Sequence, residues 1–388
     1  MLPLTGIRVL DLSRLLPGAY ASLMLLDLGA EVIKIEEPVR GDYGRWLSPR
    51  VDGQSVLHAM INRGKKSLTL NLKHPRGREL FLQLASSADV VLESFRPGVL
   101  ERLGIGFETL KAISPSIILC SLTGYGQDGP YAMQAGHDIN YLGLSGILAL
   151  NGTGDGTPLV PSIPIADIGG GGQMAVTAIM AGLLERQRTG EGQWLDVSML
   201  DGVVSWLPAL VPLLRESANV EQQSFFLSGA YACYTVYATA DGRHMSVGIL
   251  EPKFWKSFCE AMDLAEYLPL QLAPLAVQAV MKTRIQEIFL EHAQAYWIAK
   301  FQGVDTCCAP VRRLDEVAAD EQVRWRDMLA VPADGGVPRV GCPIKSTGGS
   351  RETAILPAPR LGQDTDAMLR GLGVTSAERD QLRRDGVV

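Results

Sequence analysis

Short apolar runs alternate with segments of helical spacing through the first half of the chain. Four runs have the length and β-branched content of buried strands, at 7–12 (IRVLDL), 31–35 (EVIKI), 89–93 (DVVLE) and 116–121 (SIILCS). Apolar positions spaced three or four residues apart predict helices at 17–29, 77–88 and 107–112. Because such alternation builds a parallel sheet with helices on both faces, we predict an α/β fold with a Rossmann-like large domain.

The pattern changes in the second half. A long helix is predicted between Gly172 and Arg188, followed by a strand at 193–197, and the polar stretch 216–223 suggests a linker. Beyond it, a hairpin is predicted around Asp241-Gly242. Its strands and the helices that follow are predicted at 231–238, 244–250, 252–262, 275–292 and 295–303. The chain thus divides into a large α/β domain (1–215), a smaller α+β domain (216–325) and a C-terminal segment (326–388) that returns to the large domain or ends in surface loops.

Charge and hydropathy limit the partners. The chain has 36 Lys plus Arg against 42 Asp plus Glu, a net charge of −6, which disfavours nucleic-acid binding. The most apolar stretch, 203–214, is shorter than the ~18 residues that span a bilayer, and no secretory pattern opens the sequence. We expect a cytoplasmic protein with no membrane partner. The six cysteines lack C-x-x-C spacing and predict reduced core thiols.

Several common catalytic and nucleotide motifs are absent. The turn after the first strand reads SRLLPGAYAS and lacks G-x-G-x-x-G, which removes the main support for NAD. No G-x-x-x-x-G-K-[ST], G-x-S-x-G or H-E-x-x-H pattern occurs either. The sequence therefore argues against a nucleoside triphosphatase, a serine hydrolase and a zinc peptidase.

Three short stretches carry candidate chemistry: GHDINY (136–141), ADIGGGG (166–172) and GILEP (248–252). Each has a structural interpretation as well. His137, followed by Asp-x-Asn, could cap a helix, and Asp167 could be an N-cap before the next helix, with the glycines serving close packing. Glu251 before a proline is, by itself, more typical of a solvated strand end. Taken singly, the three stretches leave these alternatives open.

Together, their order and spacing resemble the α-methylacyl-CoA racemases of the class III CoA-transferase superfamily. The resemblance covers nearly the whole chain. Supporting stretches are LDLGAEVIKIE (26–36), INRGKKSLTLNLK (61–73), SFRPGVLERLGIG (94–106), TGYGQDGP (123–130), RTGEGQWLDVSMLDG (188–202) and YTVYATADGRHMSVG (234–248).

The resemblance implies two uses of Asp167. In the transferases the matching aspartate attacks an acyl-CoA and carries covalent intermediates. In the racemases it is a base, and a histidine matching His137, paired with a glutamate matching Glu251, works on the opposite face of the substrate. Because His137 and Glu251 are both present, we expect a racemase of 2-methyl-branched acyl-CoA thioesters acting through an enolate. A CoA-transferase with an aspartyl-CoA thioester on Asp167 is the alternative.

Removal and return of an α-proton requires two groups of moderate pKa on opposite sides of one carbon. The enolate oxygen also needs hydrogen-bond donors, each worth about 3–4 kcal/mol when well placed. The backbone around Gly169 and Gly170 is the predicted donor, since no Cβ intervenes there. The alternative is that these glycines only permit tight packing.

A CoA thioester is polyanionic, so its site should be cationic. Residues 34–102 hold 12 Lys plus Arg against 8 Asp plus Glu, whereas the whole chain is acidic. Cations suited to phosphate and lying in family-like stretches are Arg40, Arg63, Lys65, Lys66, Arg96 and Arg102. CoA would be part of the substrate, and the reaction needs no metal or redox cofactor. The resemblance further implies an interlocked homodimer in which Glu251 reaches the partner's His137.

Overall fold

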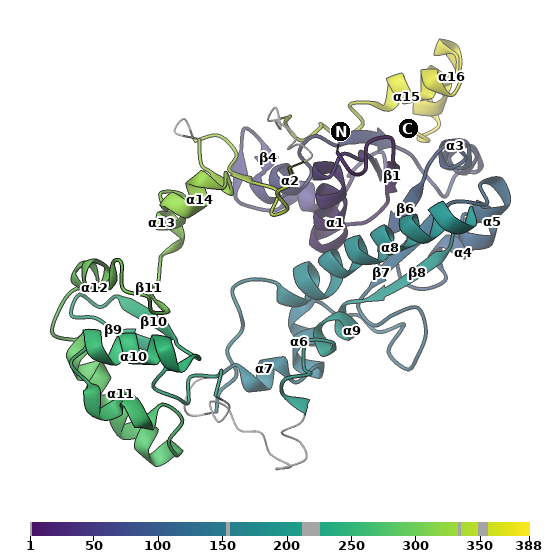
Figure 1. Ribbon diagram of the computed structural model, residues 1–388. Helices are drawn as coiled ribbons and strands as arrows, with labels where there is room; N and C mark the ends of the chain where they lie inside the picture. The colour runs from purple at the N-terminus through teal and green to yellow at the C-terminus, as the bar shows by residue number, and fades with distance from the viewer. Residues whose placement is uncertain (1, 153–155, 212–225, 333–334, 348–355) are drawn as a thin grey trace. The chain divides into compact units, whose positions relative to one another are not determined.

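The computed structural model describes residues 2–152, 156–211, 226–332, 335–347 and 356–388. The chain divides into two compact units (Figure 1). Unit 1 comprises Met1–Ile147, Pro161–Leu207 and Glu321–Val388, and unit 2 comprises Leu148–Val160 and Pro208–Asp320. The linker predicted at 216–223 lies outside the described residues.

Unit 1 is built on a six-stranded sheet in which every pairing is parallel. Its strands, in spatial order, are β5 (Lys66–Thr69), β2 (Glu31–Glu36), β1 (Arg8–Asp11), β6 (Val90–Glu93), β7 (Ile118–Thr123) and β8 (Trp194–Ser198). In chain order this is 3-2-1-4-5-6, the doubly wound order, with the direction of winding reversing between β1 and β6. The predicted parallel α/β architecture is confirmed. Strand β5 was not predicted, because its sequence KSLT has a single large apolar residue.

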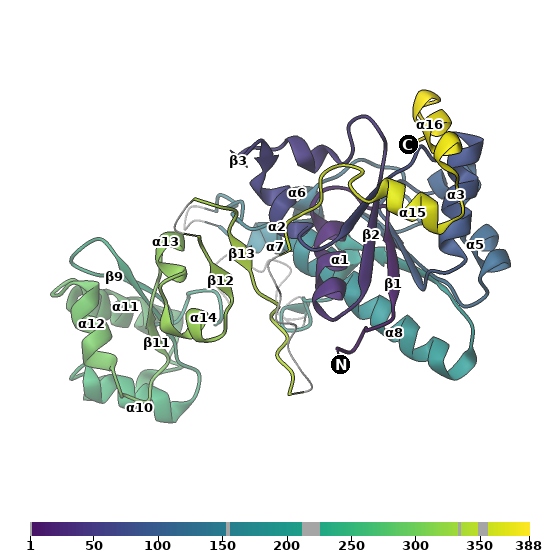
Figure 2. The ribbon, with the colours of Figure 1, turned by 90° about the horizontal axis from the view of Figure 1, so that it is seen from above.

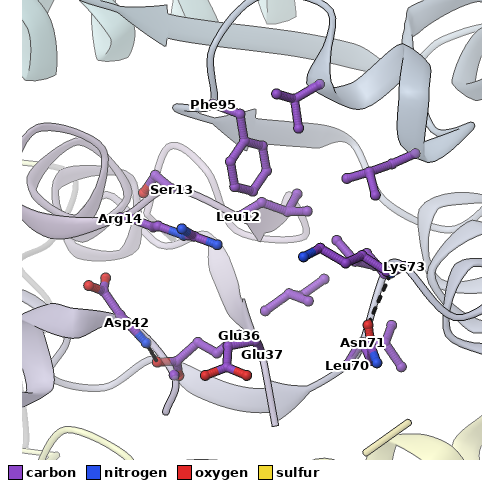
Figure 3. Close-up of a pocket in the computed structure, with 15 residues that line it drawn as sticks. Leu12, Ser13, Arg14, Glu36, Glu37, Asp42, Leu70, Asn71, Lys73 and Phe95 are labelled. Atoms are coloured by element: carbon purple, nitrogen blue, oxygen red, sulfur yellow. Dashed lines mark hydrogen bonds between the residues drawn. The ribbon is translucent and has the colours of Figure 1, made fainter. Parts of the chain in front are cut away.

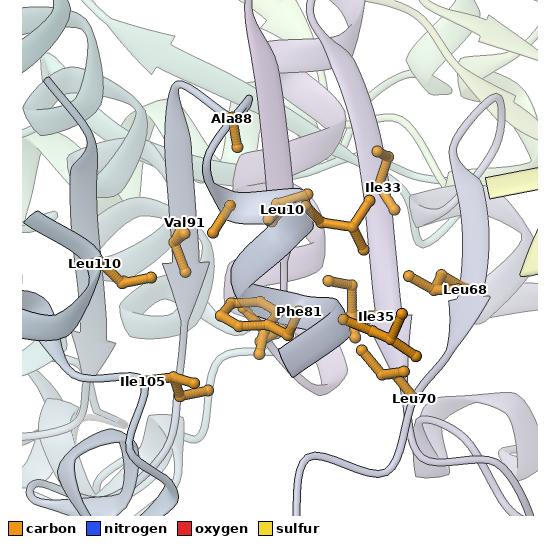
Figure 4. Close-up of a cluster of buried hydrophobic side chains, with 14 of the residues drawn as sticks. Leu10, Ile33, Ile35, Leu68, Leu70, Phe81, Ala88, Val91, Ile105 and Leu110 are labelled. Carbon is orange, nitrogen blue, oxygen red and sulfur yellow. The ribbon is translucent and has the colours of Figure 1, made fainter. Parts of the chain in front are cut away.

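Helices cover both faces of this sheet. On one face lie α1 (Leu15–Asp27) and α8 (Met174–Thr189), and on the other α3 (Pro75–Ala85), α4 (Val99–Leu103) and α5 (Phe107–Ile113). Side chains alternate along each strand, so Leu10, Ile33 and Val91 point toward α3 and meet Phe81 there (Figure 4). Burial of each such side chain contributes about 1.5–3 kcal/mol.

The C-terminal segment closes the edge of the sheet beside β5. Thr365 Oγ1 accepts a hydrogen bond from Thr69 N–H at 3.0 Å, and Asp364 accepts one from Ser67 N–H at 2.8 Å. Helices α15 (Thr365–Gly371) and α16 (Ser376–Arg384) follow, and α16 lies beside α3 (Figure 2). An edge strand capped in this way is protected from pairing with other chains.

Unit 2 holds a three-stranded antiparallel sheet, in the order β11 (Cys308–Pro310), β10 (His244–Gly248), β9 (Tyr234–Ala238). The predicted hairpin is present, and Gly242 takes a φ of +72°, as its tight turn requires. Its helices are α10 (Pro252–Ala261), α11 (Leu275–Phe289) and α12 (Gln294–Phe301). Sheet and helices enclose an aromatic core that includes Trp255, Phe258 and Trp297.

The remaining elements are short. They are η1 (Tyr43–Trp46), β3 (Arg50–Val51), β4 (Gln54–Ser55), α2 (Val56–Ile61), α6 (Asp138–Leu144), α7 (Ile147–Leu150), η2 (Ala166–Gln173), α9 (Met199–Val204), η4 (Ala265–Leu270), α13 (Leu314–Val317), α14 (Glu321–Trp325), β12 (Leu329–Ala330) and β13 (Arg339–Val340). Over the described residues, no helix is both long and apolar enough to cross a membrane.

Two local expectations need correction. The helix predicted past Gly172 is preceded by η2, a π-helix that runs directly into α8. Asp167 therefore lies within helical structure and is not an N-cap. All six cysteines are free, but Cys307 is exposed and Cys308 and Cys342 are only partly buried. The expectation of core thiols holds for the other three.

Candidate active site

A cavity of about 610 Å³ opens at the carboxyl ends of β1, β6 and β7 in unit 1. This is where the strand order reverses, the usual ligand site of a doubly wound sheet. His137, Asp167 and Tyr141 all lie on its wall, together with Arg14 and Met199. The structure thus brings two of the three predicted catalytic side chains into one cavity.

His137 combines the two interpretations that its sequence allowed. It occupies the N-cap position of α6, where Asn140 Oδ1 accepts its backbone N–H at 3.0 Å. The residue is exposed, and it lies on the cavity wall. The backbone of His137 therefore starts the helix, and its side chain is accessible from the cavity.

Asp167 is half-buried in the first turn of η2. Burial, and then the negative charge of Asp138, raise the pKa of its carboxyl, and His137 partly offsets both, so that the pKa is about 6. A carboxyl with a pKa near 6 is a stronger base than an ordinary aspartate and still ionised at neutral pH. Perturbed carboxyl groups in a cavity are typical of catalytic sites.

Three tyrosines pack against one another at the cavity, and two of them, Tyr125 and Tyr141, line it. Tyr125 contacts Tyr131 and Tyr141 edge-to-face, with ring centroids 5.9 and 5.1 Å apart. A Cβ on Gly124 would lie 2.4 Å from the Tyr141 hydroxyl, and one on Gly136 would lie 2.7 Å from the Tyr125 hydroxyl. The glycine that opens GHDINY is thus needed for this close packing. Burial, and then the charge of Asp167, raise the pKa of Tyr141. Sequence reasoning missed Tyr141, although it closes the same motif.

The four glycines after Ile168 are packed tightly against neighbouring helices. A Cβ would lie 2.4 Å from the Trp206 ring at Gly169, 2.8 Å from the Met199 carbonyl at Gly170 and 2.9 Å from the Pro17 carbonyl at Gly172. The close-packing interpretation is therefore supported, and the oxyanion role of Gly169 and Gly170 stays a prediction.

A second cavity of about 290 Å³ adjoins the first and shares Arg14, Phe95 and Val99 with it. Figure 3 shows the side chains of Arg14 and Lys73 reaching into this cavity from different sides. The Arg14 guanidinium lies over the Phe95 ring, 5.3 Å from its centroid. Sequence reasoning did not single out Arg14 or Lys73. Arg14 closely follows the predicted strand at 7–12, and this was the available signal for it. Lys73 follows β5, which was not predicted, so it had no such signal.

The backbone at Arg14 and Leu15 is held in an unusual conformation. Leu15 has a φ of +54°, which disfavours any residue with a Cβ by roughly 1–2 kcal/mol. Its N–H donates to both carboxylate oxygens of Asp42, at 3.1 and 3.2 Å, and the Arg14 N–H donates to Ser94 Oγ at 3.0 Å. These bonds fix where the Arg14 side chain leaves the backbone.

The six predicted CoA-binding cations separate into two groups. Arg96 and Arg102 line the larger cavity. The other four line neither cavity: Arg40, Arg63, Lys65 and Lys66. Of these, Arg40 is exposed, and Lys66 forms an ion pair with Glu31.

Arg63 and Lys65 are buried and form ion pairs in the interior of unit 1. Arg63 makes a bidentate ion pair with Asp27, at 2.8 and 2.6 Å. Lys65 Nζ donates to Ser22 Oγ and Asn62 Oδ1 and forms an ion pair with Asp11 at 3.3 Å. Burial lowers the pKa of Lys65 to about 8 despite Asp11. The part of both cations in CoA binding stays a prediction.

Glu251 lies in unit 2, whereas His137 and Asp167 lie in unit 1. It is exposed and immediately precedes Pro252, which begins α10. Its carbonyl accepts hydrogen bonds from Phe254 and Trp255 N–H, both at 3.1 Å. The backbone of Glu251 thus starts a helix, and its pairing with a histidine stays a prediction.

The fold and the cavity define a doubly wound α/β protein with a cavity at the strand ends. The model of CoA-transferase family III matches residues 4–365, and the chain belongs to that family. Its members are enzymes, and the family predicted from the three motifs is confirmed.

Racemases and transferases are both among its relatives. The chain is 33% identical to human alpha-methylacyl-CoA racemase, covering 99% of this chain and 97% of that protein. It is also 33% identical to the mouse succinyl-CoA:glutarate CoA-transferase, covering 95% and 86%. The crystal structure of a CAIB/BAIF family protein from Brucella suis superposes with a TM-score of 0.84 at 30% identity, covering 96% of this chain and 99% of that one. These identities do not separate the two activities.

Proposed function

We propose that the chain is an epimerase of 2-methyl-branched acyl-CoA thioesters that works by 1,1-proton transfer. The observation that carries the proposal is that an imidazole and a carboxyl of raised pKa, His137 and Asp167, lie on the wall of one cavity. In one direction, the Asp167 carboxylate takes the α-proton, the C–H electron pair forms a carbon–carbon double bond, and the carbonyl π pair moves to the thioester oxygen. The resulting enolate is then protonated at the same carbon, from the opposite face, by the His137 imidazolium. The reverse reaction exchanges the two roles.

The cavity wall supplies charge of the sign that a CoA thioester requires. Arg14, Arg96 and Arg102 line it, and Lys73 lines the adjoining cavity. We propose these four cations as the groups that hold the phosphates, because charge-assisted hydrogen bonds to phosphate are stronger than neutral ones. Arg40 and Lys66, which line neither cavity, then have no direct contact with the nucleotide.

We further propose a homodimer in which Glu251 of one chain orients the partner's His137. Both side chains are exposed in the single chain, and they belong to different units. Carboxylates commonly hold a catalytic imidazole in this way. Mixing His137→Ala with Glu251→Gln subunits tests it, because a mixed dimer would contain one intact site. Activity restored by mixing supports the shared site, and a monomer by sedimentation, or no restoration, contradicts it.

The second candidate is a CoA-transferase, favoured by the transferases among the relatives. There the Asp167 carboxylate would attack the thioester carbonyl and expel the CoA thiolate, which leaves a mixed anhydride. The thiolate would then attack the aspartyl carbonyl, release the carboxylic acid and leave an aspartyl-CoA thioester. A second carboxylate would collect the CoA in the same two steps, reversed.

Incubation with a 2-methylacyl-CoA in D₂O without an acceptor acid separates the two activities. The epimerase exchanges the α-hydrogen and loses optical activity, both followed by NMR and polarimetry. The transferase instead gives a hydroxylamine-sensitive adduct on Asp167 and turns over only when an acceptor is added. Asp167→Ala should abolish both activities. His137→Ala should lower the rate of racemisation by roughly 10²–10⁴-fold and leave any transfer half-reaction intact.

A further inference from the structure

The residue after His137 connects the helix that begins at His137 to the helix that holds Asp167. Asp138 is the first residue of α6. Its Oδ1 accepts hydrogen bonds from the backbone N–H groups of Ala166, at 2.6 Å, and of Asp167, at 3.0 Å. One carboxylate oxygen thus satisfies two first-turn amides of η2, which have no carbonyl partner within their own helix.

We propose that Asp138 is a positioning residue, which fixes the backbone of Asp167 relative to His137 and keeps a negative charge beside the Asp167 carboxyl. The inference rests on the proposed function only in taking Asp167 as the group that reacts. The two consecutive residues then have different roles. The side chain of His137 lies on the cavity wall, and the carboxylate of Asp138 holds the backbone of Asp167.

The electrostatic part of the role agrees with this geometry. After burial, the charge of Asp138 is the larger of the remaining influences on the pKa of Asp167, and His137 acts in the opposite direction. Tyr141 of α6 and Tyr43 of η1 also face Asp167, but the pKa of each phenol is raised, so both are neutral at pH 7. Arg14 lies on the same cavity wall.

Such a charge has a clear use in the reaction. An α-carbon is a weak acid, and a general base works best when its pKa is close to the working pH. Loss of the Asp138 charge would make Asp167 a weaker base. Loss of its oxygen would release the backbone of Asp167, and a displacement of about 1 Å at a reacting group can lower a rate roughly 10²-fold.

Two substitutions separate these contributions. Asp138→Asn keeps an acceptor oxygen and removes the charge, whereas Asp138→Ala removes both. Asp201→Asn is the matched control, because Asp201 is an exposed first-turn carboxylate on α9, which contacts the same π-helix, and does not line the cavity. Circular dichroism and thermal melting check that each variant is folded.

The measurement is the pH dependence of kcat/KM for α-hydrogen exchange, together with a ¹³C titration of the Asp167 carboxyl, assigned by its absence in Asp167→Asn. In Asp138→Asn we expect the acidic limb and the carboxyl titration to move to lower pH while most of the activity remains. In Asp138→Ala we expect the same movement and a further loss of roughly 10²-fold in rate. The control should match the unmodified protein.

The inference is overturned if Asp138→Asn titrates like the unmodified protein, if Asp138→Ala is as active as Asp138→Asn, or if Asp201→Asn causes the same shift. Failure of the proposed function looks different. In that case the unmodified protein exchanges no α-hydrogen and forms the hydroxylamine-sensitive adduct. The ¹³C titration of Asp167 would still test Asp138, as would the pH dependence of adduct formation.

Discussion

Toward their carboxyl ends, strands β1 and β2 bury apolar side chains on one face of the sheet and charged side chains on the other. Along β1, Leu10 points toward α3 and joins a cluster made only of apolar residues (Figure 4). Its neighbour Asp11 points toward α1, where Ser22 Oγ donates to it at 2.6 Å. Asp11 and the two ammonium groups near it, Lys34 and Lys65, are fully buried.

The two kinds of buried side chain have different effects: the apolar ones stabilise the sheet, and the charged ones position a turn. Apolar burial is non-directional and stabilises the sheet as a whole. The charges on the α1 face act through geometry: Lys34 Nζ donates to the Ser13 carbonyl at 2.9 Å and pairs with Asp42 at 3.0 Å. Asp42 in turn holds Leu15. We infer that the charged face fixes the turn that places Arg14 between the two cavities.

The largest effect is expected from Lys34→Met, which keeps the volume and leaves Asp11 and Asp42 short of a partner. Removal of one partner from a buried ion pair costs about 3–5 kcal/mol. The free energy of unfolding, measured with urea, should fall by that amount, and KM for the acyl-CoA should rise because the Arg14 turn loses its support. A loss below about 1 kcal/mol would show that the charges do not act as a linked set.

Next in size is Leu10→Ala, on the same strand but the apolar face. Deletion of a buried leucine side chain costs about 2–5 kcal/mol. Urea unfolding should report this loss, whereas KM should stay unchanged. If KM rises as much as in Lys34→Met, the proposed division between the two faces is wrong.

The acid stability of the charged face follows from Glu36. Burial alone would raise the pKa of this carboxyl, but the Arg45 hydrogen bond and the charge of Lys34 outweigh burial and lower it to about 2 from 4.5. Because the pKa is depressed in the folded state, Glu36 contributes its stabilisation above about pH 4.5 and loses it as the pH falls toward 2.

That contribution is about 3 kcal/mol. Glu36→Gln should therefore reduce the loss of unfolding free energy between pH 5 and pH 3, measured with urea. Glu108→Gln, at an exposed site on α5, is the control and should leave the pH dependence as it is. If both variants show the same dependence of unfolding free energy on pH, Glu36 does not contribute to acid stability.

The smallest effect concerns the ligand directly. Arg14→Met should weaken binding of CoA, measured by calorimetry, by about 1.5–3 kcal/mol, the contribution of a hydrogen bond to a charged group. Arg40→Met is the matched control, because Arg40 is exposed and lines neither cavity. Equal losses in the two variants would mean a general charge effect with no specific contact at Arg14.

The strands and helices of both units could be predicted from the sequence where the apolar periodicity was strong. Ion pairs between residues far apart in the chain could not be predicted from the sequence. The stretch NRGKK offers three adjacent cations, yet Arg63 and Lys65 find their carboxylates 36 and 54 residues earlier in the chain. Composition counts such charges without showing which carboxylates they pair with in the fold.

The candidate site was predictable to a similar extent. His137 and Asp167 were found because their motifs are distinctive, and the cavity that joins them depends on strand order. The π-helix around Asp167 could not be predicted, since four glycines predict a loop as readily as a helix. The place of Arg14 after a predicted strand was a signal, but the positive φ of Leu15 and its bonds to Asp42, which direct the Arg14 side chain, could not be predicted locally.

The most direct test of the central claim uses single enantiomers in D₂O. His137→Ala and Asp167→Asn are each incubated with the R and then the S form of a 2-methylacyl-CoA, and deuterium at the α-carbon is followed by NMR. If the two groups act from opposite faces, neither variant racemises, and each exchanges one enantiomer only, the opposite one in the two variants. Exchange of the same enantiomer by both variants would contradict the account.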